Sequence, residues 1–103
     1  MPREREQRVG RELRVSHVHF VPAEAEDQVT GLLGWVSFDV NGGLHLDGVA
    51  VRRTLRREIR LAFPSRRDRS GKRHYAIRPI SDAARRDVER QVVEELYRQG
   101  WVA

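Results

Sequence analysis

The chain has 103 residues, of which 39% are hydrophobic and 34% charged, with a formal net charge of +5 and no cysteine. This length and composition predict one folded domain with one modest core and argue against wholesale disorder. The lack of cysteine excludes disulfides, thiolate metal sites and a cysteine nucleophile, and the sequence has no apolar run of about 18 residues that would predict a membrane span.

The first predicted elements are an arm and two strands. Residues 1–11 are expected to form a flexible basic arm, ahead of a single domain over residues 12–103. The arm is charged and lacks the apolar core of a secretory signal, so we expect a cytoplasmic protein. Residues 13–21 are rich in β-branched side chains and predict the first strand. In residues 32–40 every even position is apolar or small, which predicts a half-buried second strand.

Three further strands are predicted, all able to pair as antiparallel neighbours. Residues 41–43, Asn-Gly-Gly, favour a tight turn. The third strand, residues 44–51, changes its inward-facing set near Gly48, which predicts a β-bulge. The fourth strand begins at Arg57 and stops at Pro64, and the fifth follows the turn at residues 70–71. The side chains predicted to face inward in these three strands are Leu44, Leu46, Val49, Val51, Ile59, Leu61, Phe63, Tyr75 and Ile77.

A helix is predicted at the end of the chain. Ser81 is a good N-cap, and Gly100 suits a C-terminal cap. Between them an apolar residue recurs every fourth position, which gives the helix one face to bury. The expected fold is therefore α+β, a curled antiparallel sheet of about five strands with one C-terminal helix packed on it. The apolar stripe consists of Ala84, Val88, Val92 and Leu96.

Positive charge is concentrated in residues 52–78, where eleven Lys and Arg stand against Glu58 and Asp68, a net of +9. Such a band attracts an anionic partner over a long range. Nineteen of the twenty basic residues are arginine, whose guanidinium clamps phosphate oxygens or a guanine edge, and this favours nucleic acid. The candidate nucleic-acid-binding residues are Arg52, Arg53, Arg56, Arg57, Arg60, Arg66, Arg67, Arg69, Lys72, Arg73 and Arg78.

The same region carries a family resemblance. Residues 62–67, Ala-Phe-Pro-Ser-Arg-Arg, are followed by Gly71 and by residues 79–81, Pro-Ile-Ser, ahead of an acid-rich helix. This order resembles the SpoVG family, the stage V sporulation protein G or septation-regulator proteins of bacteria, over roughly residues 15–98. The resemblance implies a small homodimer that binds DNA, and in some members RNA, to regulate genes in sporulation, septation or virulence. The chain looks like a divergent member, since Arg78 stands where His is common.

Other interpretations of the same residues remain open. The basic band could dock an acidic protein partner, or be only a solvated surface that resists aggregation. His17 and His19 could offer two metal ligands, but no third is evident, so we expect no metal site. Residues 70–73 lack most of a phosphate-binding loop, so we expect no nucleotide cofactor. The acids fall in loops or on the solvent face of the helix, so we expect neither an enzyme nor a small-molecule substrate.

Self-association is also predicted. One helix on one side of a sheet leaves Leu33 and Trp35 of the second strand without an obvious covering layer. An exposed strand edge beside them invites pairing with another chain. We therefore expect a two-fold homodimer as well as a nucleic-acid partner, and no membrane partner.

Overall fold

The computed structural model describes residues 13–103, so the predicted arm over residues 1–11 lies outside the described residues. These described residues form two antiparallel sheets, one short helix and one long C-terminal helix. This arrangement confirms the α+β class predicted from the sequence. In chain order the elements are β1 (Val15–Pro22), α2 (Ala25–Gln28), β2 (Leu32–Val40), β3 (Leu44–Arg53), β4 (Ile59–Ala62), β5 (Ser65–Arg67), β6 (Arg73–Tyr75) and α3 (Asp82–Arg98).

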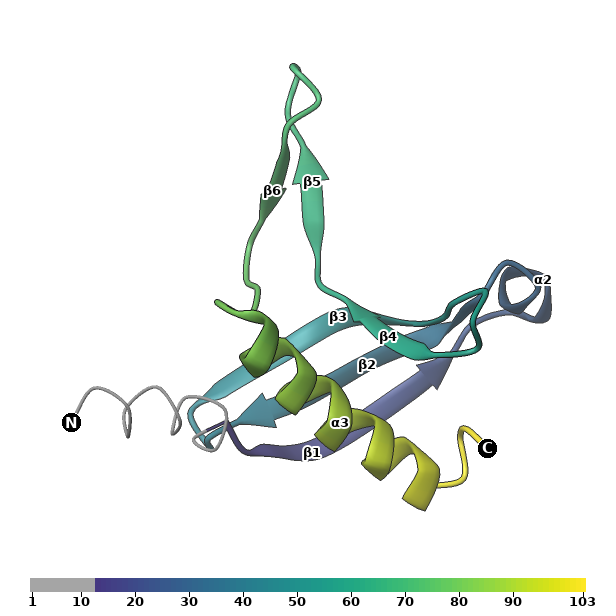
Figure 1. The fold of residues 1–103 in the computed structure, drawn as a ribbon. Helices are drawn as coiled ribbons and strands as arrows, with labels where there is room; N and C mark the ends of the chain where they lie inside the picture. The colour runs from purple at the N-terminus through teal and green to yellow at the C-terminus, as the bar shows by residue number, and fades with distance from the viewer. Residues whose placement is uncertain (1–12) are drawn as a thin grey trace.

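The main sheet has four strands in the order β1-β2-β3-β4, and α3 lies across one of its faces (Figure 1). The predicted fifth strand does not join this sheet. It is β6, which pairs with the short strand β5 in a separate two-stranded ribbon, Ser65 opposite Tyr75 and Arg67 opposite Arg73. Pro64 lies between β4 and β5 and has no backbone N–H for the ladder, so the chain leaves the sheet there. Tyr75 and Ile77, predicted to face inward, are 44% and 39% exposed.

The core lies between α3 and the covered face of the sheet. The apolar stripe of the helix is buried as predicted, and it packs on the inward side chains of β2 and β3. Each fully buried valine, leucine or phenylalanine stabilises the fold by about 1.5–3 kcal/mol relative to an exposed one. The largest fully buried side chains are Phe38, Leu96, Val36, Val49, Val51 and Val92.

Both ends of α3 are capped as the sequence predicts. The Ser81 hydroxyl accepts a hydrogen bond from the Ala84 N–H at 3.1 Å. At the other end Gly100 has a φ of +85°, and the Gly100 and Trp101 N–H groups donate to the carbonyls of Tyr97 and Leu96. The Trp101 ring then lies 5.2 Å from that of Phe20, centroid to centroid, and fastens the end of the helix to β1.

The register of the main sheet shifts at three places: between Ser16 and His19 of β1, and between Leu32 and Gly34 and between Val36 and Phe38 of β2. Two of these shifts lie beside Gly48 and His17, both of which have a positive φ. The predicted bulge at Gly48 is confirmed, since its φ is +66° and the β2–β3 register shifts beside it. A second bulge at His17, with a φ of +53°, interrupts the β1–β2 register and was not predicted. It changes the alternation of β1, so that Val15 packs against the core together with Val18. Leu44, expected to face inward, is 60% exposed at the end of the sheet.

Candidate nucleic-acid interface

Residues 65–78, which we call the basic hairpin, project away from the rest of the molecule (Figure 1). The hairpin comprises β5, its turn, β6 and the three residues that follow, and every one of its residues is exposed. Because no layer covers either side of the ribbon, side chains on both faces are available to a partner. Its basic residues are Arg66, Arg67, Arg69, Lys72, Arg73 and Arg78.

The one acidic residue of the basic hairpin organises its turn. One Asp68 carboxylate oxygen accepts hydrogen bonds from the Ser70 N–H, the Ser70 hydroxyl and the Lys72 N–H, at 2.9, 2.6 and 3.0 Å. The other oxygen lies 2.8 Å from His74 Nε2. The Ser70 hydroxyl, followed by His74 and the Lys72 amide, lowers the pKa of Asp68 to about 2. An aspartate at the start of a turn was the sequence signal for this role.

Among residues 13–103, the charged side chains of the basic hairpin have no acidic partner. No carboxylate oxygen of these residues lies within 4.0 Å of a side-chain nitrogen of any of the six cations. Within the same residues the Arg67 guanidinium donates only to the Gly71 carbonyl, at 2.8 Å. Arg67 and Arg73 are also cross-strand partners, and like charges directly opposite one another repel. A bound anion would relieve this repulsion.

The predicted arginines at the start of the basic band form a second group, which we call the turn cluster. It consists of Arg52 and Arg53 at the end of β3, and Arg56 and Arg57 in the turn to β4. Arg52 donates to the Thr30 carbonyl at 3.3 Å, which places this cluster near α2. Residues 58–64 separate it from the basic hairpin, and the four of them that form β4 span about 13 Å. The predicted band is therefore two clusters at opposite ends of β4.

Arg60 lies between the two clusters, but its guanidinium is engaged by acids. It lies 3.1 Å from a Glu58 carboxylate oxygen and 3.7 Å from one of Glu89. Glu89 was expected on the solvent face of the helix and is instead 7% exposed, because its carboxylate accepts from the Leu61 N–H at 3.0 Å and pairs with Arg85 at 3.2 Å. Glu89 thus joins α3 to the edge strand β4, and Arg60 belongs to this structural group.

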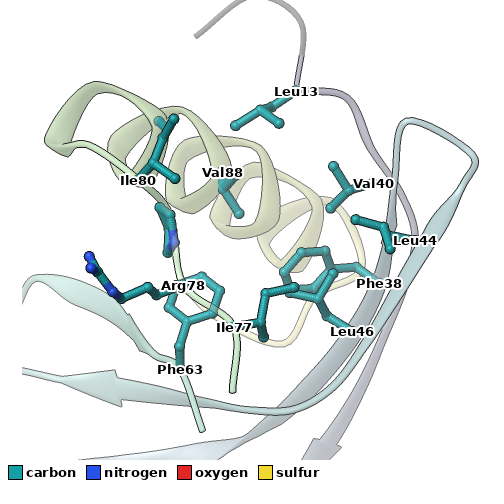
Figure 2. Close-up of a pocket in the computed structure, with 12 residues that line it drawn as sticks. Leu13, Phe38, Val40, Leu44, Leu46, Phe63, Ile77, Arg78, Ile80 and Val88 are labelled. Atoms are coloured by element: carbon teal, nitrogen blue, oxygen red, sulfur yellow. The ribbon is translucent and has the colours of Figure 1, made fainter. Parts of the chain in front are cut away.

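An apolar cavity of about 250 Å³ lies where the base of the basic hairpin meets α3 and the end of the main sheet (Figure 2). Ile80 and Leu44 at this cavity are 82% and 60% exposed. Among the described residues that line it, Arg78 alone is charged, and Figure 2 shows the guanidinium pointing away from the apolar side chains. The sequence did not predict the cavity. Its lining includes Ile77 of the basic hairpin and three residues that flank the hairpin, Phe63, Pro79 and Ile80.

Titratable groups also meet on the outer face of the main sheet, the face opposite α3. Asp39 lies 2.7 Å from His45 Nδ1 and 3.2 Å from His17 Nδ1, and Asp47 lies 3.2 Å from His45 Nε2. The hydrogen bond to Asp39, more than that to Asp47, raises the pKa of His45. Over the described part of the chain, no three His, Asp or Glu side chains are arranged to hold a metal ion. No helix found in residues 13–103 is long and apolar enough to cross a membrane.

Comparison with known proteins adds no assignment. No protein-family model matches the chain, and no curated protein matches it. The interpretation of the basic surface therefore depends on its own geometry and charge, together with the motif resemblance in residues 62–81.

Proposed function

We propose that this protein is a nucleic-acid-binding regulator of the SpoVG type, acting in the cytoplasm as a homodimer. The observation that carries the proposal is the state of the six cations in the basic hairpin. They lie on a ribbon exposed on both faces, they have no acidic partner within residues 13–103, and the one nearby acid is used by the turn. Each phosphate neutralised by such a cation releases counterions and favours binding.

The shape of the basic hairpin supports nucleic acid over a generic anion. The major groove of duplex DNA is about 12 Å wide and admits a two-stranded β-ribbon. Contacts from Arg66, Arg67 and their neighbours would go mostly to phosphates, which position the protein without specifying sequence. An arginine that reaches a guanine edge would supply any base readout. The turn cluster offers a second, smaller set of phosphate contacts.

The homodimer is proposed at the apolar cavity. Leu33, one of the two residues expected to lack cover, packs against the core of its own chain. Leu44 and Ile80 are both more exposed than Trp35, and these two residues lie at the cavity. A second copy seated there would bury them and bring two basic hairpins together. A monomeric mass by light scattering at about 50 µM protein would contradict the dimer, since interfaces of ordinary size hold above that concentration.

A salt titration tests nucleic-acid binding. We expect the logarithm of the binding constant for duplex DNA to fall linearly with the logarithm of salt concentration. With five to eight phosphate contacts per dimer the slope should lie between about −4.5 and −7, and heparin should displace the DNA. An interaction module for an acidic protein would instead need one particular acidic surface. No DNA or RNA binding at about 50 mM salt would rule out the proposal and favour that alternative.

A further inference from the structure

The outer face of the main sheet carries an apolar row that crosses all four strands. Trp35 of β2 is the register partner of Val21 on one side and of Ala50 on the other, and Ala50 is in turn the partner of Ala62. The Trp35 side chain is 40% exposed. Ala50 and Ala62 have short side chains, so the Trp35 indole protrudes beyond its neighbours on that side of the row. A planar group could therefore lie against it.

A cation and a histidine lie beside this row. Arg52 follows Ala50 by two residues, so it shares that face and lies diagonally across from Trp35, about 7–8 Å away. His19 is the equivalent diagonal neighbour on β1 and is exposed. Asp39, the acid of the same strand, lies four residues away, about 13 Å along β2. Its carboxylate is already paired with His17 and His45.

The row also leads to the basic hairpin. Ala62 ends both the row and β4, and the chain passes from there through two residues into β5. Trp35 lies two strands from β4, a separation of about 10 Å. A polyanion held by the hairpin is therefore within reach of the indole.

We infer that this face binds single-stranded nucleic acid, with one base stacked on Trp35 and the backbone held by Arg52 and the basic hairpin. The inference rests on the proposed function and adds to it the class of nucleic acid. Base faces are hidden in a duplex, so a stacking aromatic contributes only where bases are unpaired. The phosphates of both forms bind the hairpin. Trp35 should therefore raise affinity for single strands and leave duplex affinity unchanged.

Fluorescence gives a direct test, because the chain has only two tryptophans. In a Trp101→Phe variant, which keeps an aromatic ring beside Phe20, Trp35 is the sole reporter. Adding oligo(dT) or oligo(U) should quench its emission, whereas a duplex of equal length should quench it much less. Replacing Trp35 by leucine should lower single-strand affinity about five- to 150-fold, which corresponds to the loss of one stacked base. Duplex affinity should change less than about twofold.

Two controls separate stacking from other roles of the face. Trp35→Phe keeps an aromatic surface and should retain most of the single-strand affinity. Val21→Ala trims an exposed neighbour in the same row, without removing an aromatic, and should change nothing. Light scattering on the Trp35→Leu variant then reports whether its mass is that of the parent.

The outcomes distinguish the two proposals. If Trp35→Leu binds single strands as tightly as the parent while duplex binding follows the expected salt slope, only the stacking inference is wrong. If the variant halves in mass and loses duplex and single-strand binding together, the face is a self-association surface and the inference is also wrong. If the parent protein binds neither form, the proposed function itself is wrong.

Discussion

Helix α3 and the basic hairpin are both rich in arginine, but the two regions use it differently. In α3, Arg90 lies 2.9 Å from Asp87 and 3.3 Å from Glu94, and Arg98 pairs with Glu95. These hydrogen bonds raise the pKa of both arginines, and Arg98 with Gln99 lowers the pKa of Glu95 to about 2. The helical repeat brings residues three and four apart together, so Arg85, Arg90 and Arg98 each pair with an acid on their own helix.

The basic hairpin has no such acids. A ribbon places cross-strand neighbours side by side, and here Arg67 faces Arg73. The only acid, Asp68, is bound to the turn and to His74. Arginine content alone therefore does not indicate a binding surface. What distinguishes the two regions is whether the fold supplies each cation with a partner, and this difference yields separate predictions for stability and for binding.

The largest effect on stability should come from Glu89→Ala in α3. This change removes the acceptor of the Leu61 N–H and the shared partner of Arg60 and Arg85. A hydrogen bond to a charged group is worth about 1.5–3 kcal/mol, and the two ion pairs are partly exposed and add little. We expect the free energy of unfolding in urea to fall by about 2–3 kcal/mol.

The matched control for this change is Glu94→Ala. Glu94 is an exposed acid of the same helix and pairs only with Arg90 among the described residues. Its removal should cost no more than about 0.5 kcal/mol. Equal losses for the two variants would contradict the role given to Glu89 in joining α3 to β4. Both variants should bind nucleic acid as the parent does once folded, because neither touches the basic hairpin.

The next effect is on binding. Replacing both Arg66 and Arg67 by alanine should lower the salt slope by about 1.8 per protomer, or about 3.6 for the proposed dimer. At 0.15 M salt the loss of affinity, for any sequence, is then about 30-fold for each protomer that contacts the nucleic acid. The midpoint of unfolding should not change, because both side chains are exposed. Filter binding or fluorescence anisotropy at several salt concentrations measures both quantities.

The control variant removes two positive charges from α3 instead of from the basic hairpin. Arg90→Ala with Arg98→Ala also lowers the net charge by two, but takes it from cations already paired with acids. We expect this variant to bind nucleic acid within about threefold of the parent, since a distant charge acts only through a screened field. If the two double variants lose affinity equally, only net charge matters and the basic hairpin is an ordinary solvated surface.

The sequence predicted those parts of the fold that short-range rules decide. Alternation of apolar residues predicted which side chains of β2 face the core, and Gly48 predicted the bulge in β3. Ser81 and Gly100 predicted where α3 begins and ends. The partner of β6 could not be predicted this way. Alternation around Tyr75 looks the same in a central strand and in a free ribbon, and pairing is decided by segments distant in sequence.

The candidate site was predictable in composition but not in arrangement. The arginines lie in one predicted basic band in the sequence, whereas β4 separates the turn cluster from the basic hairpin in the fold. Arg60 is among the predicted binding residues because its partner Glu89 lies 29 residues away in the sequence, beyond the range of a local pattern. The sequence predicted that Trp35 lacks a covering layer. It did not predict that Ala50 and Ala62 lie in the same row as Trp35, because this depends on the register of β3 and β4.

The smallest and most local effect should appear at the turn of the basic hairpin as pH falls. The pKa of Asp68 is lowered from 3.8 to about 2 in the folded chain. A carboxylate with a lowered pKa stabilises the fold above its unfolded value of 3.8, and this contribution is lost as pH falls from about 4 through about 2. The turn should therefore loosen in this range.

Glu95 titrates over the same range, so a local probe is needed to separate the turn from α3. Nuclear magnetic resonance of the Ser70 and Lys72 amides reports the turn, because both donate to Asp68. Their chemical shifts should move between about pH 4 and pH 2. The Asp68→Asn variant has no carboxylate at this position and should abolish this change in chemical shift. The chemical-shift changes of Arg98 and Gln99, which report the titration of Glu95, should remain. If the Ser70 and Lys72 amide shifts still change over this pH range in Asp68→Asn, another titrating group controls the turn and Asp68 does not organise the hairpin.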